Sequence, residues 1–266
     1  MPPDAARPIV AVLGLGEAGS LIARDLVRGG CTVRGWDPEP HGDLSEIPFA
    51  PSFAAAVDGA HIVLSVNWAI VARDVARDAL PYLRPSTVYA DLNTAGPALK
   101  RELAEIVAPS GAHFVDVAMM TPVPPVGVRV PMFLAGNGAE ALAAFLRPLG
   151  TPLEIVGDLP GDAAARKLTR SVFFKGMAGA VCEALEAARA AGVEDWLRAD
   201  ITRTFLGADE TLLDRIVEGT HKHAKRRAHE MRDATELLDA LGVPSTITRA
   251  TTESLERIVS DRQSGV

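Results

Sequence analysis

Three glycines near the N-terminus have the spacing of a loop that binds a phosphate-bearing ligand. Gly14, Gly16 and Gly19 follow an apolar run at 9–13 and precede a segment with apolar residues at helical spacing. In such a strand, turn and helix, the first glycine permits the tight turn, the second lets a pyrophosphate approach the backbone, and the third lets helix and strand pack closely. The free N–H groups at the helix start favour an anion. The spacing therefore predicts a dinucleotide-binding loop, and an ordinary glycine-rich turn is the alternative.

A carboxylate follows the next β-rich run. Residues 31–36 predict a strand, and Asp37 comes directly after it, 18 residues beyond Gly19. A carboxylate at this place accepts hydrogen bonds from both hydroxyls of an adenosine ribose and repels a 2′-phosphate. No arginine directly follows Asp37 to hold a phosphate, so NAD is favoured, with NADP possible. Because Pro38 comes next, a turn-forming role is the alternative for Asp37.

Two lysines and a serine recur every fourth residue in the second half of the chain. Lys167, Ser171 and Lys175 therefore share one face of a helix expected at 163–191. The two amines would lie about 12 Å apart along the axis, so both cannot serve one atom. A lysine ammonium donates a proton to a carbonyl oxygen, and a neutral lysine accepts one from a hydroxyl. Because this helix is apolar nearly all round, a functional lysine is favoured over a solvated charge.

The elements that must position these residues alternate along the first 160 residues. Strands are expected at 9–13, 31–36, 61–66, 87–90 and 113–117, and helices at 20–28, 53–57, 68–80, 98–107 and 139–146. This alternation predicts right-handed crossovers and a doubly wound, mainly parallel sheet of Rossmann type. Ligands bind beyond the carboxyl ends of such strands. Asn67 and Asn93 stand there, and each either contacts a nicotinamide ribose or caps the helix that follows.

Beyond about residue 160 the β pattern stops. Helices are expected at 163–191, 194–205, 209–240 and 246–259, with Gly192 and the run 242–244 as helix stops. The sequence thus predicts an α/β domain at 1–160 and an all-α domain at 161–266. A lone subunit would expose much of the apolar helix at 163–191, so we expect a homodimer through the helical domain.

Composition excludes several classes of protein. The 266 residues are 48% apolar, and the net charge of −7 argues against a nucleic-acid binder. No apolar run reaches the length of a membrane span, which predicts no membrane partner. The two cysteines, Cys31 and Cys182, lack the spacing of a metal or disulfide framework, so we expect no metal and a cytoplasmic location. A small-molecule substrate is the expected partner.

Taken together, these residues resemble the β-hydroxyacid dehydrogenase family, which includes 3-hydroxyisobutyrate and 6-phosphogluconate dehydrogenases. The glycine loop is similar to the family's cofactor loop, and 91–97 is similar to its Asp-x-Ser-Thr-x-x-Pro stretch, with Asn93 in place of Ser. Lys167 stands where the family keeps its catalytic lysine, and His229 falls where the family has Lys at the mouth of the site. The resemblance implies hydride transfer between NAD(P) and a small hydroxy or keto compound, with Lys167 as general acid or base.

The chain departs from the family in the loop expected to grip the substrate. Where most members have Asp-x-Pro-Val-Ser-Gly-Gly, residues 116–122 read Asp-Val-Ala-Met-Met-Thr-Pro. Met119 and Met120 replace small anion-gripping residues, so the substrate is expected to be bulkier, less acidic or held elsewhere. These methionines either line a pocket or pack under a loop. With Ser171 in place of the usual Asn, the chain resembles a divergent branch with its own type of C-terminal domain.

Two sets of site residues follow from the motifs and the resemblance. The expected cofactor contacts are Gly14, Leu15, Gly16, Glu17, Ala18, Gly19, Asp37, Val66, Asn67, Asn93 and Thr94. The expected substrate contacts are Met119, Met120, Thr121, Ser171, Lys175 and His229. His229 lies in a basic run at 221–229, which by default is a solvated helix face. Two alternative functions stay open. One is imine reduction, as in a related group that commonly has Asp or Tyr where Lys167 stands, and the other is non-catalytic nucleotide sensing.

Overall fold

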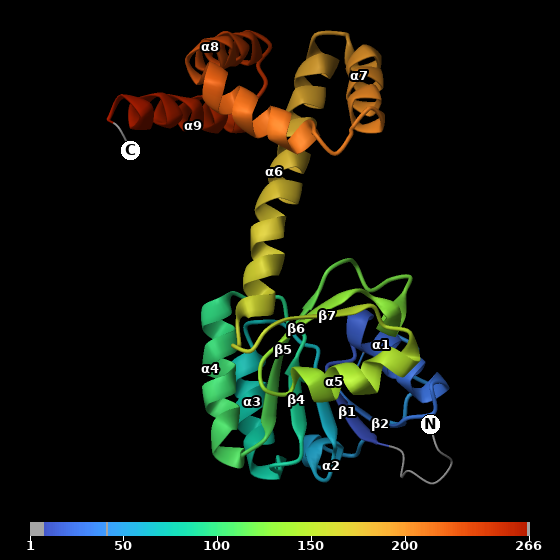
Figure 1. Ribbon diagram of the computed structural model, residues 1–266. Coiled ribbons are helices and arrows are strands. Elements are labelled where there is room, and N and C mark those ends of the chain that lie inside the picture. The colour runs from blue at the N-terminus through green and yellow to red at the C-terminus, as the bar shows by residue number, and fades with distance from the viewer. Residues whose placement is uncertain (1–7, 41, 265–266) are drawn as a thin grey trace. The chain divides into compact units, whose positions relative to one another are not determined.

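The computed structural model of the protein describes residues 8–40 and 42–264 (Figure 1). The chain divides into two compact units, one ending at Arg170 and the other beginning at Ser171. The sequence places the domain boundary after residue 160, whereas this division falls inside a long helix, α6 (Asp162–Ala190).

The first unit is built on one twisted sheet. Its strands are β1 (Ile9–Leu13), β2 (Thr32–Trp36), β3 (Ile62–Ser65), β4 (Val88–Asp91), β5 (His113–Met119), β6 (Met132–Ala135) and β7 (Leu153–Gly157). They lie in the order β2-β1-β3-β4-β5-β6-β7. Each neighbouring pair is parallel except β5 with β6, so the mainly parallel, doubly wound sheet is confirmed. The sequence did not predict β6 and β7, because both are short runs bounded by Pro and Gly.

The order of the strands brings four loops to one edge of the sheet. The chain enters in β1, then places β2 on one side of it and β3 on the other, which creates a topological switch point. In register, Leu13 pairs with Ser65, Ser65 with Asp91, and Asp91 with Asp116. The segments that follow these residues therefore start side by side, although they come from distant parts of the sequence.

Helices cover both faces of the sheet. They are α1 (Glu17–Arg28), α2 (Phe53–Val57), α3 (Ala72–Ala79), α4 (Pro97–Val107) and α5 (Ala139–Leu146). Val10 and Val12 point into a core shared with α1 and α5, while Ala11 and Leu13 point into a second core shared with α2, α3 and α4. This alternation is the period of two that a doubly covered strand requires. Figure 1 shows α3 and α4 together on one side of the sheet.

The second unit is helical. It consists of the remainder of α6, α7 (Glu194–Leu206), α8 (Leu212–Ala240) and α9 (Thr246–Gln263), and the helix stops at Gly192 and Gly242 are confirmed, each with positive φ. The helix expected at 209–240 differs from the structure in two respects: α8 begins at Leu212, and the backbone at His223 is non-helical, with φ −112° and ψ 17°. Among the described helices, none is long and apolar enough to cross a membrane.

Glu183 of α6 joins two helices of this unit. Its carboxylate accepts hydrogen bonds from the backbone N–H groups of Ile247 and Thr248 and from the Thr248 hydroxyl, each at 2.7–2.8 Å, in the first turn of α9. Partial burial raises the pKa of Glu183, but these hydrogen bonds outweigh it and leave the pKa below its ordinary value of 4.5. The carboxylate thus acts as an N-terminal cap that is supplied by another helix.

Replacing this carboxylate is expected to change how stability depends on pH. A lowered pKa contributes stability that is present above about 4.5 and is lost as the pH falls through the folded-state value. Glu183→Gln should therefore cost about 1 kcal/mol at neutral pH and progressively less in acid. Thermal unfolding of parent and variant across this range measures the difference.

Glu186→Gln is the matched control, because Glu186 is exposed one turn later on the same helix. Glu186→Gln should keep the stability of the parent at neutral pH, and the difference between the two should not change as the pH falls. A constant gap between parent and Glu183→Gln from neutral to acid pH would reject the capping role of the charge.

Candidate active site

The glycine loop adopts the geometry that its spacing predicts. Gly14 has φ +98°, and a Cβ there would lie 2.2 Å from the carbonyl oxygen of Val66, while a Cβ on Gly19 would lie 1.9 Å from that of Gly14. These two glycines are required by the protein's own packing. A Cβ on Gly16 would meet no protein atom within 4 Å. Gly16 therefore faces open space at the start of α1, where exposed N–H groups favour a pyrophosphate. The loop fits a dinucleotide.

Asp37 is fixed beside this loop. Its carboxylate accepts a hydrogen bond of 2.7 Å from the backbone N–H of Leu15 and one of 2.9 Å from that of Glu39. The Leu15 side chain, in contrast, is fully buried in the core. The expected cofactor contact of Leu15 is therefore limited to its backbone, because the side chain points into the sheet.

The strand ends enclose a cavity of about 600 Å³, which we call the strand-end cavity. It is lined by Gly14, Gly16, Glu17, Ala18, Gly19, Asp37, Pro38, Glu39, Val66, Asn67, Trp68, Ala69, Val71, Leu92, Asn93, Thr94 and Met119. The structure thus brings together all the expected cofactor residues except Leu15. The volume of the strand-end cavity lies in the range of small-molecule sites. Sequence reasoning did not single out the lining residue Glu39; its position just after a strand was the available signal.

Asn93 holds the loops after β3 and β4 together. Its amide donates a hydrogen bond of 2.6 Å to Asp91 and a longer one of 3.4 Å to Ser65, and its amide oxygen accepts from the backbone N–H of Asn67. The Asn67 amide in turn donates to Ser65 at 2.9 Å. The N-cap residues of α3 and α4 are Val71 and Gly96, with no side-chain cap, so the capping alternative for both asparagines is excluded.

Lys167 reaches the edge of the cavity. It lies in the second turn of α6, is partly buried, and its Nζ donates a hydrogen bond of 2.9 Å to Oγ1 of Thr94, which lines the cavity. One turn later, the Arg170 guanidinium donates to the carbonyl oxygen of Met120 at 3.3 Å. The amine of α6 and the loop after β4 therefore meet at one place. Arg170, which sequence reasoning did not single out, ties the loop after β5 to the same helix.

A buried ion cluster underlies this meeting point. The Lys100 ammonium donates hydrogen bonds to Oδ2 and to the backbone oxygen of Asp91, at 2.6 and 2.8 Å. It also lies 3.1 Å from Oδ1 of Asp116, as an ion pair. The three side chains are at most 1% exposed. Burial raises the pKa of Asp91 above its ordinary value, and the Lys100 charge opposes that rise. The ammonium thus has three oxygen atoms within 3.1 Å, two of which accept hydrogen bonds from it.

Asp116 connects the cluster to α6. Its second oxygen, Oδ2, accepts hydrogen bonds from the backbone N–H groups of Gly161 and Ala164, at 3.1 and 2.9 Å. A carboxylate on β5 therefore caps the positive end of the helix that carries Lys167. Because Asp91 also binds Asn93, Lys100 links the loop that carries Thr94 to the helix that carries Lys167.

The expected substrate residues fall into separate groups. Met119 lines the strand-end cavity, as the pocket-lining alternative predicts. Met120 packs against a small apolar cluster that includes Ala163, as the packing alternative predicts. Thr121 is exposed. Ser171, Lys175 and His229 belong to the second unit, and their roles stay predictions. Across 8–40 and 42–264, no group of three His, Cys, Asp or Glu side chains is placed to hold a metal ion.

A mainly parallel sheet with a glycine turn, a carboxylate after β2 and a lysine at the same edge defines an NAD(P)-binding oxidoreductase fold. Two family models match parts of the chain, and the first of them agrees with this description. Residues 9–121 match the NAD binding domain of 6-phosphogluconate dehydrogenase. Residues 188–258 match a domain of unknown function, DUF1932.

A similar protein of known structure extends the match over nearly the whole chain. A conserved hypothetical protein from Sinorhizobium meliloti 1021, of known structure, is 32% identical, with 95% of this chain and 88% of that chain covered and a TM-score of 0.64. A probable 3-hydroxyisobutyrate dehydrogenase from Mycobacterium bovis is 28% identical over 152 residues, which are 54% of this chain and 50% of that protein. An imine reductase from Myxococcus stipitatus, solved with NAD⁺, shares the fold at 20% identity, with a TM-score of 0.80 and 96% and 94% of the chains covered. The chain belongs to the β-hydroxyacid dehydrogenase family, as a divergent member with a C-terminal domain of its own type.

Proposed function

We propose that this protein transfers a hydride between NAD and a small hydroxy or keto compound, with Lys167 as the general acid and base. The observation that carries the proposal is the 2.9 Å hydrogen bond from Lys167 Nζ to Thr94, at the edge of the strand-end cavity. A lysine on an arbitrary exposed helix face would have no reason to meet this loop. The family to which the chain belongs supports the same reaction class.

The place of each residue in the site determines its role in the reaction. When bound, the nicotinamide supplies or accepts the hydride. The exposed N–H groups behind Gly16 hold the pyrophosphate, and Asp37 accepts hydrogen bonds from the adenosine ribose. In the reducing direction the Lys167 ammonium donates a proton to the carbonyl oxygen, and in the oxidising direction its neutral amine removes the hydroxyl proton. Thr94 orients the amine, and Met119 presents an apolar surface to the substrate.

Turnover on a panel of substrates tests the proposal. The full chain is mixed with NADH and with 2-keto acids, 3-keto acids, aldehydes or cyclic imines, and oxidation of NADH is followed by absorbance. Turnover on a keto acid or an aldehyde is expected. Tight binding of NADH without turnover on any compound would favour a nucleotide sensor and overturn the proposal.

Imine reduction is the second candidate, because the similarity to imine reductases reaches a TM-score of 0.80. Sequence identity in that comparison is only 20%, so it concerns the fold alone. The lysine argues against it, since an ammonium repels the iminium cation that such an enzyme reduces. Turnover on cyclic imines alone would reverse this ranking.

Selection of NAD over NADP is expected to depend on Asp37. Both Asp37 and Glu39 line the cavity, and Arg34 is engaged elsewhere, donating to the backbone oxygens of Ala55 and Asp58. Asp37→Asn keeps an oxygen for the Leu15 N–H but removes the charge that repels a 2′-phosphate. The ratio of the NADPH and NADH dissociation constants should fall by about tenfold, which corresponds to about 1.4 kcal/mol. Fluorescence titration with each nucleotide measures it.

Asp78→Asn serves as the control for charge, because Asp78 is exposed on α3 and does not line the cavity. It should leave the ratio unchanged. An equal shift in both variants would assign the effect to net charge and not to the position of Asp37.

We also propose a homodimer through the helical domain. Large apolar side chains of the second unit are exposed in the single chain: Val172 is 77% exposed, Trp196 64%, Leu206 83% and Leu213 67%. Such a concentration of exposed apolar surface is typical of an interface. Light scattering should give twice the mass of the 28.0 kDa chain. The mass of one chain at micromolar concentration would contradict the dimer.

A further inference from the structure

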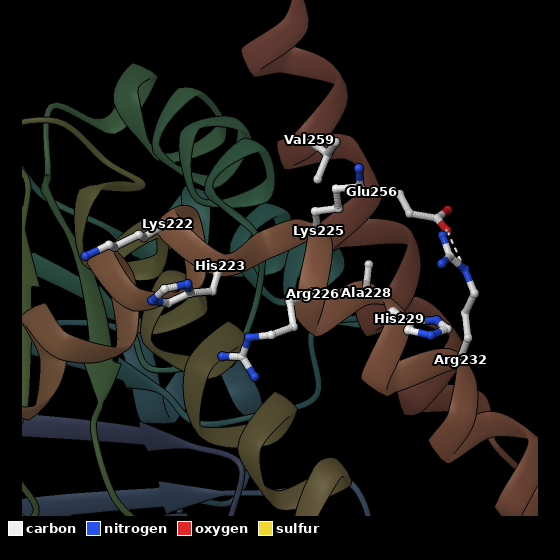
Figure 2. A pocket seen from close by; sticks show the side chains of 9 residues that line it. All are labelled: Lys222, His223, Lys225, Arg226, Ala228, His229, Arg232, Glu256 and Val259. Carbon is white, nitrogen blue, oxygen red and sulfur yellow. Dashed lines mark hydrogen bonds and ion pairs between the residues drawn. The ribbon is translucent and has the colours of Figure 1, made fainter.

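A groove with basic walls lies on the second unit, between α8 and α9, and has a volume of about 730 Å³ (Figure 2). We call it the basic groove. It is lined by Lys222, His223, Lys225, Arg226, Ala228, His229, Arg232, Glu256 and Val259. The cavity described above is lined by residues of the first unit, so the two sites share no residue.

The sequence of α8 explains why the groove forms. Ala224 and Ala228, one turn apart, are buried against Leu255 of α9. Their small side chains let the two helices pack closely, and the long cationic side chains that alternate with them remain outside this contact. The non-helical backbone at His223 bends α8, and Figure 2 shows basic side chains on both sides of the bend. The result is a hollow and not a convex helix face.

Charge in the groove is strongly unbalanced. Four of its nine residues are Lys or Arg and two are His, whereas Glu256 is the one acid among them. Glu256 is already paired with Arg232 at 2.5 Å, and Arg226 is paired with Glu230. Lys222 and Lys225 form no ion pair with any residue in the part of the chain that the structure describes. In a chain with a net charge of −7, this local surplus of positive charge is a specific feature of one surface.

We propose that the basic groove binds a small ligand with at least two clustered negative charges, a phosphate ester or a polycarboxylate. Lysine ammonium groups are point charges that suit phosphate and carboxylate oxygens. Lys222 and Lys225 are exposed, so they remain available to a ligand, while the partly exposed Val259 gives its carbon skeleton an apolar contact. The volume is that of a small-molecule site. His229, an expected substrate contact, also lines the groove. The proposal instead rests on Lys222 and Lys225, to which the reaction proposed above gives no role.

A nucleic acid fits the groove less well than a small anion. Binding to a polyanion relies on many phosphate contacts spread along an extended basic surface. Here the surplus is confined to one groove on an acidic protein, so the rest of the surface would repel a long polyanion. A compact anion gains the local attraction without that repulsion.

Calorimetric titration of the full chain tests the groove directly. The probes are tripolyphosphate and citrate, which separate a preference for phosphate from one for carboxylate. At least one probe should bind saturably, and Lys222→Gln with Lys225→Gln should weaken it by about tenfold. The matched control is Arg257→Gln with Arg262→Gln, which removes the same net charge from exposed positions of α9 outside the groove. This control should bind within about twofold of the parent.

Three outcomes would overturn the proposal. The first is the absence of saturable binding of either probe by the parent at millimolar concentration. The second is an equal loss of affinity in the control, which would assign binding to net charge alone. The third is much tighter binding of double-stranded DNA than of both probes, which would make the surface a nucleic-acid site. Circular dichroism of both double variants confirms that α8 and α9 remain helical, so a loss of binding reports on the lysines.

Discussion

Replacing Lys167 by alanine should lower turnover by about 10²- to 10⁴-fold, the usual contribution of a positioned general acid. The amine that donates its hydrogen to Thr94 at 2.9 Å would be gone, so no side chain at this place would protonate the substrate oxygen. Binding of NADH should change little, because the glycine loop and Asp37 lie on other elements. Steady-state kinetics with the best substrate of the panel, together with NADH titration, measure both quantities.

Arg166→Ala is the matched control for the loss of a positive charge from α6. Arg166 precedes Lys167, is exposed, and pairs with Glu154 at 3.5 Å. It should keep nearly the full turnover. Addition of ethylamine should restore part of the activity of Lys167→Ala, because the truncated side chain leaves room for a small amine, and should not affect the control. Unchanged turnover in Lys167→Ala would reject the acid and base role.

Replacing Lys100 by methionine should destabilise the first unit by about 3–5 kcal/mol, the usual cost of leaving a buried charge without its partner. Asp91 and Asp116 would lose the ammonium that lies 2.6 and 3.1 Å from their carboxylates. Hydrogen exchange of peptides from β1 and β4 measures the stability of this unit by itself. Turnover should also fall, because the link between the loop of Thr94 and the helix of Lys167 would be broken.

Arg101→Met provides the comparison, since Arg101 is the next residue of α4 and is exposed. Arg101→Met should change the free energy of unfolding of the first unit by no more than about 0.5 kcal/mol. Combining Lys100→Met with Asp91→Asn should recover part of the lost stability, because one of the two unpaired charges is then removed. Equal protection of β1 and β4 in Lys100→Met and the parent would show that the cluster does not hold the unit together.

Much of the fold was predictable because its elements carry local signals. The boundaries of α2 and α5 coincide with the predictions, and those of α4 and α6 differ by one residue at most, since alanine-rich or periodic runs end there at Gly, Pro or Ser. Strands β6 and β7 escaped prediction because runs of four residues between Pro and Gly, one of them interrupted by Glu154, do not distinguish a strand from a loop. The bend in α8 has no such local signal at His223.

Residue types and short-range spacing were enough to predict the glycine loop, the carboxylate after β2 and the helix that carries Lys167. The tertiary fold alone brings Lys100, Asp91 and Asp116 together, since these residues lie on three elements and gain a common site through strand register. It also decided that Asn93 binds Ser65 and Asp91 and does not cap a helix. A buried charge needs a partner of opposite charge, and the distance between the two side chains is set by the fold and cannot be read from the sequence.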